Sequence, residues 1–191
     1  MLLNGWKYEG SVKVLHLLEV LRDRIGFERI KKYVKKPLTG LKVAPYYGCA
    51  LLRPEGAGID EADNPHIMGD LLRALGAEVI EFTADRECCG SYHVVSKPEL
   101  VYMRASNILD RVIEEGAEAL VLSCPLCDFN LDDKQKDIIE KDTSRKPVPI
   151  FYFTQLMALA FGIEKEKLGF ENHAISPTPL LKEKNLIWNQ E

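Results

Sequence analysis

Apolar residues follow two kinds of pattern along this chain. From Val14 to Ile25 they recur every three to four positions, which predicts a helix with one buried face. The same spacing, or start and stop signals, predicts further helices over residues 28–34, 64–75, 96–116, 128–141 and 154–161. Short apolar runs predict strands over residues 41–44, 79–82, 120–122 and 148–153.

Three of the predicted helices have recognisable start signals. Asn64 offers a capping side chain, and Pro65 follows at the first helical position. Ser96 and Glu99 have the spacing of a capping box. Thr154 is the expected cap of the last predicted helix. These signals fix where we expect the helices to begin.

The alternation of helices with buried strands indicates the fold class. It favours an α/β, Rossmann-like layered domain with a mostly parallel sheet covered on both faces. We expect an N-terminal helical segment over residues 1–37, the α/β domain over 38–169, and a C-terminal docking tail over 170–191. The tail is irregular but carries apolar residues, which suggests docking onto the domain.

Composition narrows the class of protein. Of the 191 residues, 46% are hydrophobic and 28% are charged, as is typical of a soluble globular protein. The net charge of −4 gives no electrostatic reason to expect nucleic acid or an anionic membrane as a partner. No apolar run approaches a bilayer span, and the N-terminus lacks the apolar stretch of a signal peptide. We therefore expect a cytoplasmic protein without a membrane span.

The five cysteines are confined to the middle of the chain. They are Cys49, Cys88, Cys89, Cys124 and Cys127, in the pattern C-x38-C-C-x34-C-x2-C. An odd number argues against a purely disulfide framework. Cys49, the adjacent pair and Cys124 each follow a predicted strand, and loops at the carboxyl ends of parallel strands open on one edge of a sheet. The sequence therefore predicts that all five converge in one site.

Several chemistries are compatible with such a site. A single cytosolic cysteine is usually a small buried hydrophobe, but that interpretation does not explain five at these positions. A thioredoxin-like dithiol at Cys124 and Cys127 would leave three cysteines unexplained. An all-cysteine zinc site would leave one thiol over. Iron–sulfur clusters are held by thiolates, and five sulfurs suit a cluster less symmetric than a simple cube.

Three stretches around the cysteines share their pattern with a known family. They are Tyr46-Tyr47-Gly48-Cys49 with Leu52-Arg53-Pro54, Glu87-Cys88-Cys89-Gly90, and Ser123-Cys124-Pro125-Leu126-Cys127 with Asn130-Leu131. The pattern resembles the CCG cysteine-rich domain, which we place over residues 38–169. Within that family the chain resembles the C-terminal half of the heterodisulfide reductase B subunit, and the resemblance extends from His16 to the tail.

The resemblance implies a specific cofactor and reaction. It implies that Cys49, Cys88, Cys89, Cys124 and Cys127 ligate a noncubane [4Fe–4S] cluster, where a disulfide is reductively cleaved to two thiols. In methanogens the substrate of related subunits is the mixed disulfide of coenzymes M and B. The implied partners are a flavin/iron–sulfur subunit and a small ferredoxin-like subunit. Some domains of this type bind zinc instead, so zinc in a non-catalytic assembly domain is the alternative.

One departure from the family pattern affects the expected activity. The family subunit carries two such domains in tandem, whereas this sequence has one cysteine set. We therefore expect a truncated fragment, or a naturally split or shortened relative, whose substrate site needs another domain or subunit.

Other side chains have weaker claims. His93 follows the vicinal cysteines and could donate a proton to a thiolate product, although a loop histidine bonded to backbone is the competing interpretation. Arg53 could bind an anionic substrate group or form a plain surface salt bridge. The basic residues at positions 31, 32, 35 and 36 are expected to be solvated surface, with docking of an acidic partner as the alternative.

Overall fold

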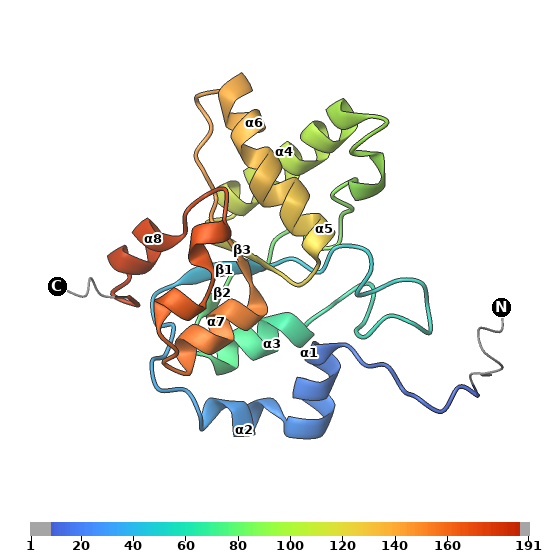
Figure 1. Cartoon of the computed structure of the whole chain (residues 1–191), viewed down its shortest axis with the longest axis vertical. Helices are drawn as coiled ribbons and strands as arrows, with labels where there is room; N and C mark the ends of the chain where they lie inside the picture. The colour runs from blue at the N-terminus through green and yellow to red at the C-terminus, as the bar shows by residue number, and fades with distance from the viewer. Residues whose placement is uncertain (1–8, 188–191) are drawn as a thin grey trace, which may run out of the picture.

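The computed structural model describes residues 9–187 and shows a layered α/β fold around a four-stranded sheet (Figure 1). The strands are β1 (Lys42–Pro45), β2 (Glu78–Val79), β3 (Ala119–Leu122) and β4 (Ile150–Tyr152). Their order across the sheet is β2-β1-β3-β4, and every neighbouring pair is parallel. The predicted fold class is confirmed.

The helices lie before, between and after the strands along the chain. They are α1 (Leu17–Glu19), which continues as a π-helical stretch (Val20–Ile25), α2 (Phe27–Lys31), α3 (Ile67–Ala74), α4 (Pro98–Glu114), α5 (Pro125–Asp128), α6 (Lys134–Lys141), α7 (Phe153–Ala160) and α8 (Thr178–Glu183). A π-helical stretch (Phe129–Asp133) joins α5 to α6, so residues 125–141 form one continuous helix. Short 3₁₀ turns occur at Ser91–His93, Lys165–Lys167 and Phe170–Asn172.

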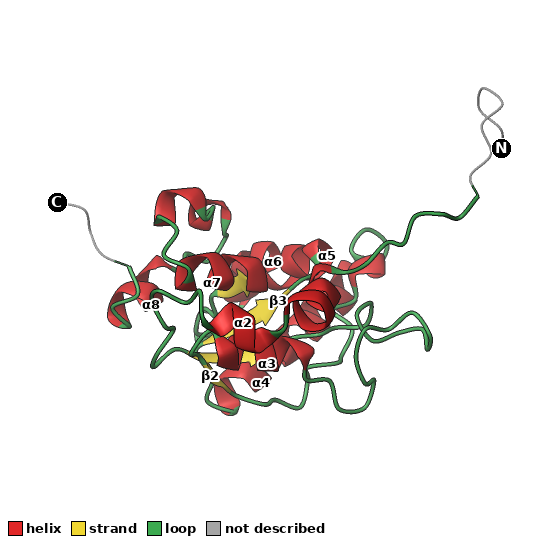
Figure 2. Cartoon of the chain, turned by 90° about the horizontal axis from the view of Figure 1, so that it is seen from below, coloured by secondary structure: helices red, strands yellow, loops and turns green. Residues whose placement is uncertain are grey.

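The sheet separates two apolar cores. Helices α4, α5 and α6 cover one face, and α1, α2, α3 and α7 cover the other (Figure 1). Successive side chains of a strand point to opposite faces, so Val43 belongs to the second core and Ala44 to the first. Leu120 and Val121 of β3 divide in the same way. Figure 2 shows the short strands enclosed between these helices.

The first helical segment and the C-terminal segment both pack onto this framework, whereas residues 9–14 are exposed. Leu18 and Leu21 of the N-terminal segment are buried in the same core as Leu181 and Leu186 of the C-terminal segment.

The division of the chain at residues 37 and 169 stays a prediction. Residues 188–191 of the predicted tail lie outside the described residues.

The predicted helix starts were wrong because distant or unexpected groups satisfy the backbone. Helix α3 begins at Ile67, and the carboxylate of Asp60, not Asn64, accepts from the backbone N–H groups of His66 and Ile67, both at 2.6 Å. Because Asp60 lies well upstream, helix-start patterns do not indicate it. The long helix after β3 begins at Pro125, three residues earlier than predicted, and therefore includes Cys127 in its first turn.

The other two predicted caps are also absent. Helix α4 begins at Pro98 without a side-chain cap at Lys97, because the preceding residues already form a turn in which Lys97 N–H donates to the carbonyl of His93. The Ser96 capping box is therefore not formed. Helix α7 begins one residue before Thr154, and the Gln155 side chain accepts from the backbone N–H of Tyr152 at 2.9 Å.

Candidate metal centre

All five cysteines follow strands at one edge of the sheet. Cys49 lies four residues past the end of β1, and Cys88 and Cys89 lie in the loop after β2. Cys124 is the residue immediately before α5, and Cys127 lies in its first turn. Because the strands are parallel, these loops leave the sheet at the same edge. The loops therefore gather thiols that are up to 78 positions apart in sequence, from 49 to 127.

Three pairs of sulfur atoms are within hydrogen-bond reach of each other. The Sγ atoms of Cys89 and Cys127 lie 3.5 Å apart. Cys127 also hydrogen-bonds to Cys124, and Cys49 hydrogen-bonds to Cys88. All five thiols are free of disulfide bonds. Cys89 and Cys127 are buried while the other three are half-buried, so the group has an inner side in the protein and an outer side that faces solvent.

Backbone contacts hold the loops against one another. The Tyr46 hydroxyl donates to the carbonyl of Glu87 at 2.6 Å, which ties the end of β1 to the residue before the vicinal pair. The backbone N–H groups of Tyr47 and Gly48 both donate to the carbonyl of Asp85, at 2.9 and 3.0 Å. The two cysteine-bearing loops are thus joined by three hydrogen bonds that do not use the sulfurs.

The surroundings favour thiolate at two positions. The hydrogen bond from Cys127 is the main reason why the pKa of Cys124 is lowered to about 5. Burial acts in the opposite direction, and the backbone N–H groups of Cys127 and Leu126 lower the pKa further. A helix N-terminus also favours negative charge at this position. The contact with Cys127, together with backbone and side-chain donors, lowers the pKa of Cys89 to about 7. The pKa of Cys127 is raised, because its proton is held by hydrogen bonds to Cys124 and Cys89.

The donor set fits a thiolate-bound metal centre. Thiolates are the ligands of iron–sulfur clusters and of many zinc sites. Gly48 has a φ of +61°, and a Cβ built on it would lie 3.5 Å from the Cys127 sulfur. The absence of a side chain there leaves space directly beside the sulfur group.

One polar side chain from the long helix reaches the sulfurs. Asn130 is fully buried, and its Nδ2 donates to the Cys89 carbonyl at 3.2 Å and to the Cys89 Sγ at 3.6 Å. In the sequence, Asn130 belongs to the family pattern but has no predicted role. Nothing in the residue pattern alone relates it to Cys89, which is 41 positions away.

His93 makes no side-chain bond to a cysteine among residues 9–187. It lies in the 3₁₀ turn Ser91–His93, its side chain is exposed, and among residues 9–187 no side-chain hydrogen bond or ion pair links it to another group. Its role in proton donation stays a prediction. Arg53 is likewise exposed and has no side-chain bond to a cysteine in the described region.

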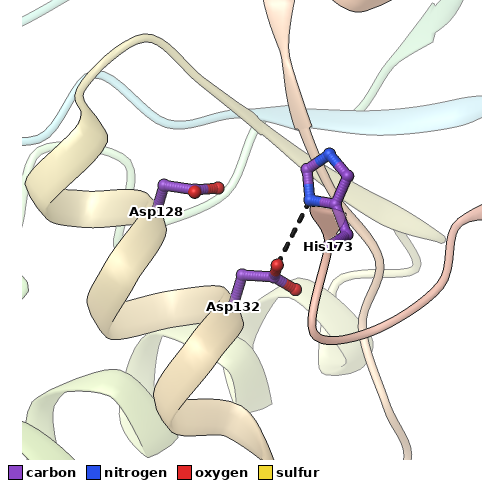
Figure 3. A group of neighbouring side chains, drawn as sticks. All are labelled: Asp128, Asp132 and His173. Atoms are coloured by element: carbon purple, nitrogen blue, oxygen red, sulfur yellow. Dashed lines mark hydrogen bonds and ion pairs between the residues drawn. The ribbon is translucent and has the colours of Figure 1, made fainter. Parts of the chain in front are cut away.

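A second group of potential metal ligands was missed by sequence analysis. Ligand atoms of Asp128, Asp132 and His173 all lie within 4.8 Å of one another (Figure 3). Both oxygens of Asp132 already have hydrogen-bond donors. They accept from His173 Nδ1 at 3.2 Å and from the backbone N–H groups of Ala174 and Ile175 at 2.7 and 3.0 Å. Burial, followed by repulsion from Asp132, raises the pKa of Asp128. The group therefore ties the continuous helix of residues 125–141 (the site helix) to the C-terminal segment around His173.

The cysteine pattern matches a known family. Residues 43–132 match the CCG family of cysteine-rich domains, a range that contains all five cysteines. This chain carries a CCG domain. The resemblance proposed from the sequence is confirmed, because relatives named as heterodisulfide reductase B subunits, or as similar to them, are 30–32% identical over 86–90% of the chain.

Three comparisons show proteins to which this chain is similar. It is 38% identical over 91% of its length to the 8-methylmenaquinol:fumarate reductase membrane anchor subunit of Wolinella succinogenes. It is 31% identical over 90% of its length to the B subunit of a CoB–CoM heterodisulfide reductase of Methanosarcina acetivorans. The chain spans only 61% and 58% of these relatives' lengths. A crystal structure of a hypothetical protein from Helicobacter pylori shares the fold, with a TM-score of 0.59 at 11% identity over 78% of this chain and 28% of that one.

The name of the Wolinella relative makes membrane contact relevant. Among residues 9–187, no helix has both the length and the apolar character needed to cross a bilayer. The predicted cellular location is not tested by this finding and stays a prediction.

Proposed function

We propose that this chain is an iron–sulfur oxidoreductase domain of the heterodisulfide reductase type, which takes part in reductive cleavage of a disulfide within an electron-transfer complex. The convergence of five unpaired thiols from three loops at one sheet edge is the observation that carries the proposal. The similarity to the B subunits of heterodisulfide reductases supports it. The proposed ligands of a noncubane [4Fe–4S] cluster are Cys49, Cys88, Cys89, Cys124 and Cys127.

The residues of this chain would each contribute to binding and orientation. The cluster, when bound, would supply one-electron steps and a place for a substrate sulfur. Cleavage of a disulfide consumes two electrons and two protons and yields two thiols. Cys89 and Cys127 form the buried side of the site, whereas Cys49, Cys88 and Cys124 lie on the side open to solvent. A disulfide would therefore approach from the outer side.

The rest of the active assembly is proposed to come from elsewhere. The site is open on its outer side, and the relatives are longer subunits of which this chain matches about 60%. We propose that another domain or subunit completes the substrate site. A flavin/iron–sulfur subunit and a small ferredoxin-like subunit are the proposed electron-supplying partners, in the cytoplasm.

A second candidate function is electron exchange with a membrane quinol. The 38% identical relative is named for such a reaction. The supporting observation here is an apolar groove of about 630 Å³ between the N-terminal helices and α7. It is lined by Leu21, Ile25, Arg29, Ile30, Tyr33, Lys35, Met157, Phe161 and Ile163. An apolar floor with cationic rim side chains could take a prenyl tail near an anionic lipid surface.

One preparation tests the main proposal. The chain is purified without oxygen, and iron, acid-labile sulfide and zinc are measured, followed by electron paramagnetic resonance after oxidation. About four iron and about four sulfide per chain are expected. Stoichiometric zinc without sulfide would support the structural alternative and reject the cluster. A Cys49→Ser variant should lose the cluster, whereas a simple dithiol switch at Cys124 and Cys127 would survive this change.

A second assay separates the two candidate functions. The cluster-loaded chain is mixed anaerobically with a reduced short-chain menaquinone analogue, or is reduced and then mixed with an organic disulfide. Cluster reduction by the quinol favours the second candidate, and loss of it in an Ile25→Glu variant would place the quinol in the groove. Cluster reoxidation with release of two thiols per disulfide favours the first.

A further inference from the structure

The site helix carries two buried amide side chains that differ in what they bind. Gln135 is 1% exposed, and both ends of its amide are used. Its Nε2 donates to the carbonyls of Leu131 and Val148 at 2.8 and 3.0 Å, and its Oε1 accepts from Val148 N–H at 2.6 Å. Asn130 is 0% exposed, but only its Nδ2 has partners, and both belong to Cys89.

The orientation of the Asn130 amide follows from these partners. A carbonyl oxygen can only accept, so the group 3.2 Å from the Cys89 carbonyl must be the NH₂ end. The same NH₂ group lies 3.6 Å from the Cys89 sulfur, within reach of an N–H···S hydrogen bond. The Oδ1 end is then buried and has no hydrogen-bond partner among residues 9–187.

The Oδ1 end of this side chain adds nothing to stability. A buried polar atom without a partner costs about 1–3 kcal/mol relative to a satisfied one. Leucine has a similar branched shape and would remove the unsatisfied oxygen. The gain that offsets this cost must therefore come from the contact with Cys89.

We infer that Asn130 is a positioning residue for the metal centre: its N–H groups hold the Cys89 backbone and draw electron density from the Cys89 sulfur. This inference rests on the proposed iron–sulfur function. Hydrogen bonds to the sulfurs of an iron–sulfur cluster are one of the factors that set its potential. A donor stabilises the more electron-rich reduced state, so Asn130 raises the reduction potential of a centre bound at Cys89.

The matched control is Gln135, a buried amide in the same helix that touches no cysteine. The test compares wild type with Asn130→Leu, Asn130→Asp and Gln135→Leu. Iron and sulfide are counted in each, the midpoint potential is measured by a redox titration followed by electron paramagnetic resonance, and the metal-free chains are unfolded by heat. The aspartate variant keeps the shape of the side chain but replaces the N–H donor with an acceptor.

The expected results separate a positioning role from a structural one. Asn130→Leu should lower the midpoint by roughly the equivalent of a tenfold change in the reduced-to-oxidised ratio, about 59 mV for a one-electron couple. Its metal-free form should melt lower than wild type by no more than Gln135→Leu does, because the Cys89 carbonyl loses one donor. Asn130→Asp should shift the midpoint further in the same direction. Gln135→Leu should melt lower because it loses three hydrogen bonds, with the midpoint unchanged.

The outcomes against the inference are distinct from failure of the proposed function. A wild-type chain that assembles no iron and sulfide rejects the proposed function and the inference with it. A wild-type chain with a cluster, together with Asn130 variants of unchanged midpoint, rejects the inference alone. If both Asn130 variants lose the cluster while Gln135→Leu keeps it, the holding role of Asn130 at Cys89 is supported.

Discussion

Replacement of Asp132 by alanine should detach the C-terminal segment from the site helix. The Asp132 side chain is 3% exposed, and that of His173 is 4% exposed. The carboxylate accepts from His173 (Figure 3) and also from two consecutive backbone N–H groups, those of Ala174 and Ile175. Alanine would leave all three part-buried donors without this partner.

The size of the effect follows from these contacts. Breaking a buried pair by removing one partner costs about 3–5 kcal/mol, and each hydrogen bond to a charged group is worth about 1.5–3 kcal/mol. We therefore expect Asp132→Ala to lower the free energy of unfolding by about 3–5 kcal/mol, unless the segment opens locally first. Total stabilities are commonly about 5–15 kcal/mol, so the change would be large.

Urea unfolding and hydrogen exchange together measure both forms of the effect. A global loss shifts the urea midpoint, whereas local opening appears as faster exchange of residues 173–187. Asp133→Ala is the control, because Asp133 is the adjacent aspartate and is exposed. Exposed substitutions usually change stability by about 0.5 kcal/mol or less. A loss below about 1 kcal/mol for Asp132→Ala, with unchanged exchange after residue 172, would refute the reasoning.

Three further changes test the site and the loops around it. In the metal-free chain, the alkylation rate of Cys124, measured by mass spectrometry, should fall little between pH 8 and pH 6. The pKa of Cys124 is lowered to about 5, so the thiolate is lost only near pH 5. A tenfold fall in rate per pH unit would contradict this. Tyr46→Phe should cost about 1–2 kcal/mol in urea unfolding, since it leaves the Glu87 carbonyl without its 2.6 Å donor; no loss would show that this tie does not hold the loops. Gly58→Ala should weaken iron binding at the neighbouring cysteine loop, because a Cβ there would lie 2.4 Å from the backbone oxygen of Leu52; wild-type iron content and melting would show that the loop yields freely.

The sequence was sufficient to predict the fold class and the meeting of the cysteines for one physical reason. Alternating helices and buried strands imply a parallel sheet, and a parallel sheet brings its loops to one edge. Cys49 and Cys124 were assigned to strand ends, and the structure brings their loops together. The prediction assumed that the strands before the cysteines are neighbours, and β2, β1 and β3 are adjacent in the sheet.

Strand lengths could not be predicted in the same way. Strand β2 was expected over residues 79–82 but covers only Glu78–Val79. The carbonyl of Val43 accepts from Ile80 N–H at 2.9 Å, and the next residue of β1 that faces β2 is Pro45. Proline has no N–H to donate, so the ladder ends there. Pro45 was visible in the sequence, but which neighbour it faces depends on the register of the sheet.

The contacts of the site helix depend on tertiary placement even more strongly. The fully buried polar residues among residues 9–187 are Asn130, Asp132 and Gln135. All three lie within six consecutive positions of one helix, directly after the Cys-x-x-Cys sequence. Periodicity assigns polar residues to the solvent face, and it gives no indication that partners 13 to 43 positions away would cover these side chains.

Each of these three residues ties the helix to a different part of the chain. Asn130 binds the loop of Cys89, Asp132 binds the turn at His173, and Gln135 binds the backbone at Val148 before β4. Since polar groups are buried only where they are satisfied or serve another purpose, the helix holds the sulfur site by directional contacts rather than by apolar packing alone. Loss of one tie should therefore speed hydrogen exchange in its own segment first. Equal acceleration in all three segments, after any single substitution, would instead mean that the helix and its partners open as one cooperative unit.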